Sequence, residues 1–124
     1  MFNTVKQSFG QIDVVINMAA ISILKRLVTF EAHEVENIVN SNFIGTFNLL
    51  NLAAEYIENG GRILTFSSNV TDSLSINYSL YVATKSAVES MSKVFSKELL
   101  GREITVNIIS PDPTNTEMFL EGKV

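Results

Sequence analysis

The sequence predicts an α/β protein built on a parallel sheet. Three short apolar runs rich in β-branched residues alternate with two longer stretches that have helical spacing. Strand, helix, strand, helix and strand in this order are typical of parallel strands joined by right-handed crossovers. The 124 residues allow one domain at most, and we expect helices to cover both faces of such a sheet.

The first half of the pattern begins with the end of a helix over residues 2–9. A buried strand over residues 12–17 follows Gly10. Helical spacing then extends from about residue 31 to residue 58, with Thr29 as the expected N-cap and acidic residues in the first turns. Gly60 and Gly61 come directly after this stretch, where glycine commonly ends a helix.

The second half repeats the order of strand and helix. Residues 62–66 form the second predicted strand, residues 69–77 a polar loop, and residues 78–100 a helix closed by Gly101. The third strand is expected over residues 104–109, stopped by Ser110 and Pro111. The tail from Asp112 is polar, with a short helical turn expected near Glu117.

Composition excludes several classes of function. The net charge of −4 and the scattered basic residues argue against a nucleic-acid partner. There is no cysteine, which excludes disulfides and thiolate metal sites. The one histidine, His33, lies in an acidic helical stretch and is expected to be solvated, with no metal. No apolar run has the length of a membrane span and no signal peptide is recognisable, so we expect a cytoplasmic protein.

Candidate site residues lie where the predicted strands end, the edge at which open α/β sheets bind ligands. These ends carry Asn17, the pair at residues 67–68, and the segment at residues 110–113. None of the strands ends in an acidic residue, which argues against a receiver domain with a phosphorylatable aspartate. Asp13 is at the beginning of its strand, the wrong end for that role.

Tyr81 and Lys85 are four residues apart in the second long helix, so they share one face. An ammonium within about 4–6 Å stabilises a phenolate and lowers the phenol pKa, which would suit the tyrosine to proton transfer with a carbonyl or an alcohol. The spacing alone is also met by exposed aromatic–cation pairs. Ser68 stands thirteen residues before Tyr81, at a strand end. Asn42 lies within the first long helix, where an amide among apolar neighbours either holds a bound group or forms a hydrogen bond to a neighbouring helix.

As a set, these residues resemble the short-chain dehydrogenase/reductase family, and 3-oxoacyl carrier-protein reductases in particular. The resemblance implies a Rossmann-like doubly wound parallel sheet, of which residues 1–124 would be the central catalytic part, with three strands and two long helices. It also implies an NAD(P)-dependent interconversion of a carbonyl and an alcohol. Tyr81 would be the general acid/base, Lys85 would lower its pKa and bind the nicotinamide ribose, Ser68 would orient the substrate carbonyl, and Asn42 would hold a relay water.

The same resemblance assigns residues that contact the cofactor, NAD or NADP. Besides Tyr81 and Lys85, these are Asn17, Ala19 and Ala20 after the first strand, and Pro111, Asp112, Thr114 and Thr116 after the third. Met18 and Ala20 depart from the family's Asn-Asn-Ala-Gly motif, and Asp112 replaces the glycine of its Pro-Gly pair. No Gly-x-x-x-Gly-x-Gly loop can be formed from the six glycines. We therefore expect a fragment or a truncated protein that binds the dinucleotide poorly.

Two alternatives stay open. An enoyl reductase of the same superfamily places its tyrosine seven residues before the lysine, a spacing that Tyr78 and Lys85 also satisfy. A non-catalytic interaction module would retain only the subunit contacts. In this family the two long helices commonly form those contacts, which implies a homodimer or homotetramer acting on a small-molecule carbonyl or alcohol.

Overall fold

The computed structural model of the protein describes residues 1–112 and contains one three-stranded sheet with helices. The elements, in chain order, are α1 (Phe2–Phe9), β1 (Val14–Asn17), the 3-10 turn η1 (Leu27–Thr29), α2 (Ala32–Val39), the π-helical segment η2 (Asn40–Ile44), α3 (Gly45–Tyr56), β2 (Arg62–Phe66), α4 (Val70–Ser73), α5 (Ser79–Glu98) and β3 (Thr105–Ile109). The predicted helical turn near Glu117 lies outside the described residues.

The sheet confirms the predicted α/β class and parallel topology. Its strand order is β1-β2-β3, and both pairings are parallel. Val15 pairs with Ile63, which pairs with Val106 on the other side. All three strands therefore end at one edge, as the sequence predicted for the candidate site.

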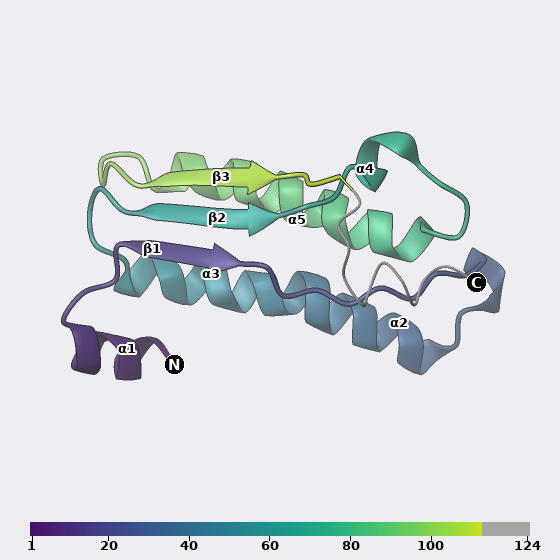
Figure 1. The fold of residues 1–124 in the computed structure, drawn as a ribbon, viewed down its shortest axis with the longest axis horizontal. Helices are drawn as coiled ribbons and strands as arrows, with labels where there is room; N and C mark the ends of the chain where they lie inside the picture. Colours follow the sequence, from purple (N-terminus) through teal and green to yellow (C-terminus); the bar gives the residue numbers. More distant parts are fainter. Residues whose placement is uncertain (113–124) are drawn as a thin grey trace.

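The two long helices lie on the same face of this sheet, as Figure 1 shows. Thr46 of α3 accepts a hydrogen bond from Asn17 of β1, and Ser92 of α5 bonds Thr65 of β2. Asn17 and Thr65 are register partners and point to the same side. Our expectation of helices on both faces was wrong for the described residues. Both right-handed crossovers advance in the same direction across the sheet, so both helices come to lie on one side.

The opposite face of the sheet is open within residues 1–112. Val14 and Ile16 of β1 are 52% and 53% exposed, whereas their neighbours Val15 and Asn17 are buried. Strand β1 thus has one face that packs under the helices and an opposite, apolar face that is exposed. Such a face requires a cover in a stable globular domain.

The N-cap of the first long helix lies two residues later than predicted. Thr29 closes the turn η1 instead, with its hydroxyl donating to the carbonyl of Arg26 at 2.8 Å. Glu31 is the N-cap, and the Glu34 carboxylate accepts its backbone N–H at 2.8 Å in a capping box. This bond is the largest cause that holds the pKa of Glu34 below its usual range, and the hydrogen bond with Lys25 is the next.

Two local features refine the predicted loops. The polar segment 69–77 contains the single-turn helix α4, which ends at Leu74 in the left-handed region with φ 49°. Gly61 lies so close to the preceding helix end that a Cβ would come within 2.8 Å of the carbonyl oxygen of Glu58. Glycine is therefore required there by the close approach of the backbone.

The core lies between the inner face of the sheet and the helices. Its buried members come from every layer, and they are Phe2, Ile12, Val15, Leu50, Ala53, Ile57, Ile63, Leu99 and Ile104. No helix among the described residues is long and apolar enough to cross a membrane.

Candidate active site

The side chains of Tyr81, Lys85 and Ser68 come together at the carboxyl edge of the sheet. Tyr81 and Lys85 occupy the first turns of α5 and are buried, with 8% and 4% of their surface exposed. The Lys85 ammonium lies 5.7 Å from the centre of the Tyr81 ring. Ser68, which follows β2, lies close enough to the phenol for its side chain to influence the phenol pKa. The predicted triad is thus a spatial cluster.

Lys85 is held by the end of β2. Its Nζ donates to the carbonyl oxygen of Phe66 at 2.8 Å. Apart from its proximity to the Tyr81 phenol, the Ser68 side chain has one weak interaction among the described residues, since its Oγ accepts the Val70 N–H at 3.5 Å. The Ser68 hydroxyl therefore keeps most of its hydrogen-bonding capacity for a ligand.

The electrostatics of this cluster differ from our expectation. Burial raises the pKa of Tyr81, an effect that the Ser68 side chain opposes and the neighbouring Tyr78 increases. Burial also lowers the pKa of Lys85. The pKa of Tyr81 thus lies above its ordinary value, because desolvation of the phenol dominates. At neutral pH the phenol is protonated.

Asn42 occupies the π-helical segment and is 1% exposed. Its Oδ1 accepts the N–H of Ile21 at 2.8 Å, and its Nδ2 donates to the carbonyl of Ile21 at 2.9 Å and to Thr84 Oγ1 at 3.1 Å. Both polar atoms of the amide are occupied, so the side chain fastens the loop after β1 to the helix pair. The alternative of an inter-helix hydrogen bond, which the sequence left open, is present through Thr84.

Two threonines extend this contact into a continuous polar chain. Asn17 Nδ2 donates to Thr46 Oγ1 at 2.8 Å, and Thr46 Oγ1 donates to the backbone oxygen of Asn42 at 2.7 Å. On the other side, Thr84 Oγ1 donates to the backbone oxygen of Tyr81 at 2.9 Å. Three predicted residues are thereby linked from β1 through η2 to α5. Sequence reasoning missed both threonines, although Thr46 stands one helical turn after Asn42.

The residues after β1 and β3 reach the same edge. Asn17 Oδ1 also accepts the N–H of Ala19 at 3.3 Å, while Ala19 itself is exposed and Ala20 is half-buried. The carbonyl of Pro111 accepts the N–H of Asn69 at 3.3 Å, and Asp112 Oδ1 accepts from Asn69 Nδ2 at 2.9 Å. The unexpected Asp112 therefore has a partner in the loop that carries Ser68.

Thr114 and Thr116, the remaining predicted cofactor contacts, lie outside the described residues. His33 is exposed on α2, with its Nδ1 3.4 Å from a carboxylate oxygen of Glu31. Within residues 1–112, no cluster of three or more histidine and acidic residues could hold a metal ion.

A carboxylate that sequence reasoning missed holds the Ser68 loop. Glu89 lies one turn after Lys85 on α5, and its Oε1 accepts hydrogen bonds from the hydroxyls of Ser67 and Thr71, the latter at 3.0 Å. Thr71 Oγ1 is also 2.8 Å from the carbonyl of Ser68. The spacing of four from Lys85 was the available signal, but it does not distinguish this role from a solvated surface charge.

Comparison with known protein families gives a match over nearly the whole chain. A family model described as enoyl-(acyl carrier protein) reductase matches residues 1–123. The chain is 44% identical over 89 residues to an NADPH-dependent aldehyde reductase 2, chloroplastic, of Arabidopsis thaliana, covering 70% of this chain and 33% of that protein. It is 34% identical to a short-chain type dehydrogenase/reductase of Picea abies, covering 99% of this chain and 47% of that protein.

Solved structures agree with this match. A putative dehydrogenase from Burkholderia cenocepacia with bound NADP superposes with a TM-score of 0.96 at 26% identity, covering 99% of this chain and 46% of that one. A short-chain dehydrogenase from the same species, in complex with NADP, gives a TM-score of 0.90 at 29% identity over 94% of this chain and 48% of that one. The chain thus spans a third to about half of the length of the proteins it matches here.

Proposed function

Because this chain belongs to the short-chain dehydrogenase/reductase family, we propose that it supplies the catalytic part of a single Rossmann-like domain that reduces a carbonyl to an alcohol with a nicotinamide cofactor. The observation that carries the proposal is the buried cluster of Tyr81 and Lys85 beside Ser68 at the carboxyl edge of the sheet. This cluster brings a proton donor, a hydroxyl and a cation to the edge where α/β sheets bind ligands.

The proposed roles follow from the contacts. Ser68 donates a hydrogen bond to the substrate carbonyl oxygen, and Tyr81 gives the same oxygen its proton as negative charge develops there. The raised pKa of Tyr81 keeps the phenol protonated, which suits the reductive direction. Lys85, fixed on the Phe66 carbonyl at 2.8 Å, places its charge beside the phenol, and Asn42 holds the surrounding loops in position.

The proposed cofactor is NAD or NADP, which supplies the hydride when bound. Tyr81 and Lys85 would contact its nicotinamide-ribose end, with Asn17 and Ala19 at the end of β1 and Pro111 and Asp112 at the end of β3. These residues fit that end because a buried cation and exposed backbone meet there. The chain has no glycine-rich loop for the pyrophosphate, so that part of the site would come from other residues.

Enoyl reduction is the second candidate, and the description of the matching family model favours it. It would use Tyr78, whose ring centre lies 6.4 Å from that of Tyr81 in an edge-on arrangement. We favour carbonyl chemistry because Ser68 and Lys85 are both placed around Tyr81. NADPH-dependent aldehyde reductase is also the printed activity of a relative 44% identical over 89 residues.

We further propose that the protein forms a homodimer or homotetramer through α3 and α5. Both helices have exposed apolar side chains on their outer surfaces, including Phe47 at 50% and Val94 at 56% exposure. A partner subunit would cover this surface. The alternative of a non-catalytic module would retain these contacts without turnover.

The test replaces each tyrosine in a version of the protein that carries a nucleotide-binding half before residue 1. We expect Tyr81→Phe to lower the rate of aldehyde reduction by about 10²–10⁴-fold, because the proton donor is lost. The affinity for the cofactor, measured by fluorescence titration, should change little.

Tyr78→Phe is the matched control and should retain most of the activity toward aldehydes. If Tyr78→Phe abolished turnover of an enoyl substrate while Tyr81→Phe retained it, the result would favour enoyl reduction over carbonyl reduction. If the protein with both tyrosines turned over neither substrate, the interaction module would be favoured.

A further inference from the structure

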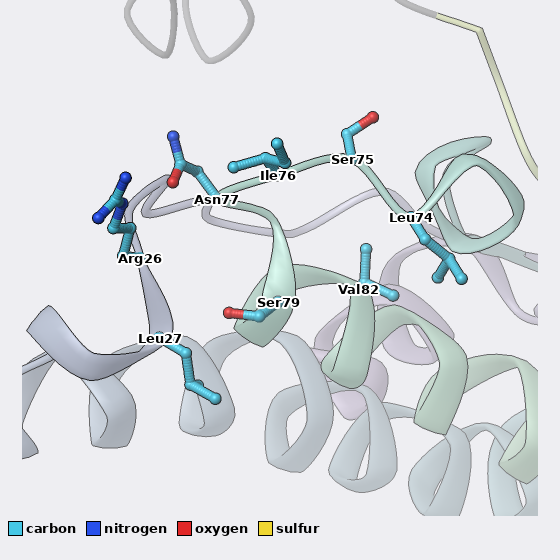
Figure 2. Close-up of a pocket in the computed structure, with 8 residues that line it drawn as sticks. All are labelled: Arg26, Leu27, Leu74, Ser75, Ile76, Asn77, Ser79 and Val82. Carbon is cyan, nitrogen blue, oxygen red and sulfur yellow. The ribbon is translucent and has the colours of Figure 1, made fainter.

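A cleft of about 310 Å³ opens beside the N-terminal end of α5, and the roles proposed above do not use it. Figure 2 shows the residues that line it. They come from the start of η1, from the segment that leads into α5, and from the first turn of α5. They are Arg26, Leu27, Leu74, Ser75, Ile76, Asn77, Ser79 and Val82. The volume is at the lower end of the range of small-molecule sites.

The cleft has a cationic side chain at one end and apolar side chains along its length. In Figure 2, the side chains of Arg26 and Asn77 lie at one end, with the apolar Leu27 and Ile76 beside them. Leu74 and Val82 lie toward the other end, on the side of Ser75. Leu74 is 69% exposed and Ile76 is 84% exposed, so the walls offer apolar surface that a ligand would remove from water. This arrangement fits an elongated ligand with one polar terminus.

Among residues 1–112, Arg26 is the only ionisable residue that lines the cleft. Within residues 1–112 its side chain has no hydrogen bond or ion pair, whereas its neighbour Lys25 pairs with Glu34 and Arg102 bonds the carbonyl of Ile57 at 2.7 Å. A guanidinium presents a planar fork of donors that matches a carboxylate. The positive charge of Arg26 at this end of the cleft is therefore complementary to a carboxylate.

The cleft adjoins the proposed active site along the chain, although Tyr81 and Ser68 do not themselves line it. The segment of residues 74–77 connects the loop of Ser68 to Tyr78, which precedes α5. Ser79 and Val82 are on the same turn of α5 as Tyr81. A substrate whose carbonyl reached Tyr81 could extend its remote end along this turn.

We propose that this cleft binds the remote end of the carbonyl substrate and selects a substrate with an apolar chain that ends in a carboxylate, which Arg26 holds. The inference rests on the proposed function, since it names the substrate class of the same site. It adds a specificity-determining residue that lies outside the catalytic cluster.

The test compares two isosteric probes, 4-phenylbutyrate and its neutral amide 4-phenylbutyramide. Their affinity for the chain and its variants would be measured by nuclear magnetic resonance titration of the backbone amides that line the cleft, with the Arg26 side-chain Nε–H signal as an additional reporter in the unsubstituted chain. We expect the carboxylate to bind about five-fold more tightly than the amide, as a partly exposed charge-assisted pair would give. Arg26→Gln should remove this preference, and Arg26→Lys, which keeps the charge but not the fork, should retain part of it.

Lys97→Gln is the matched control, because it removes one exposed cation at the far end of α5 and should preserve the preference. Equal affinity for the two probes, a preference that survives Arg26→Gln, or no binding of either probe would overturn the proposal. The measurement needs neither cofactor nor turnover. Its failure is therefore distinct from a failure of the proposed reaction, which the Tyr81→Phe comparison tests.

Discussion

At the scale of single residues, spacing predicted proximity but not electrostatics. The interval of four between Tyr81 and Lys85 was sufficient to predict a shared helix face, and the two side chains do lie together. The direction of the phenol pKa shift could not be predicted from spacing, because it depends on how much water reaches the ring and on which side chains lie beside it. Burial, which is a product of the fold, decides it.

The raised pKa of Tyr81 gives a prediction about pH. Burial favours the neutral phenol, so Tyr81 should ionise above the ordinary phenol value near 10. Carbonyl reduction, which needs the protonated phenol, should therefore be steady through neutral pH and decline only at strongly alkaline pH. Alcohol oxidation, which needs the phenolate, should increase as pH rises over the same range.

Ultraviolet titration of tyrosinate, with Tyr81→Phe subtracted, measures this ionisation directly on the chain. Ser68→Ala removes the interaction that lowers the Tyr81 pKa and should move the titration further toward alkaline pH. A titration of Tyr81 below that of a free phenol, or a shift in the acid direction in Ser68→Ala, would contradict the assignment.

At the scale of elements, the strands and the long helices could be predicted, but the interruptions within the helices could not. The stretch of residues 31–58 has helical spacing throughout, yet the structure inserts the π-helical segment η2 where Asn42 bonds Ile21. A π-helical turn contains one residue more than an α-helical turn, and tertiary contacts determine where it forms. The spacing of apolar residues in the sequence does not indicate these contacts. For the same reason the sequence assigned Thr29 as a cap, although its hydroxyl is used within η1.

The contact between α5 and the Ser68 loop gives an element-scale prediction. Glu89 accepts hydrogen bonds from Ser67, which is 3% exposed, and from Thr71. Glu89→Ala leaves the buried Ser67 hydroxyl without this partner, so the free energy of unfolding should fall by about 1–3 kcal/mol. Amide hydrogen exchange at residues 67–73 should become faster, because α5 would no longer hold that loop.

Glu98→Ala is the control for this variant, since Glu98 is exposed at the end of α5. It should change the free energy of unfolding by about 0.5 kcal/mol or less, measured by urea denaturation. If Glu89→Ala and Glu98→Ala gave the same exchange rates at residues 67–73, Glu89 would not be an anchor of the Ser68 loop.

At the scale of the whole molecule, strand order and parallel pairing followed from the order of elements, but the placement of helices did not follow from burial patterns alone. Parallel strands suggest cover on both faces, whereas the described residues place α3 and α5 on one face and leave Val14 and Ile16 exposed. The direction of successive crossovers is a topological property, and it decides the face. The same edge of the sheet still collects Asn17, Ser68 and Pro111, as predicted.

The last prediction concerns the dinucleotide, and it follows from which parts of a cofactor site the 124 residues contain. In the proposed site, Tyr81 and Lys85 would contact the nicotinamide-ribose end only, and the 124 residues contain no glycine-rich loop for the pyrophosphate. A few hydrogen bonds of about 1 kcal/mol each do not offset the entropy lost on binding. We therefore expect calorimetric titration of NADH or NADPH into this chain to give no binding in the micromolar range, and an added nucleotide-binding half to restore it. Asp112→Gly, which removes a negative charge beside Asn69, should improve the restored affinity only slightly. A dissociation constant in the low micromolar range for the 124-residue chain alone would show that its own residues hold the pyrophosphate.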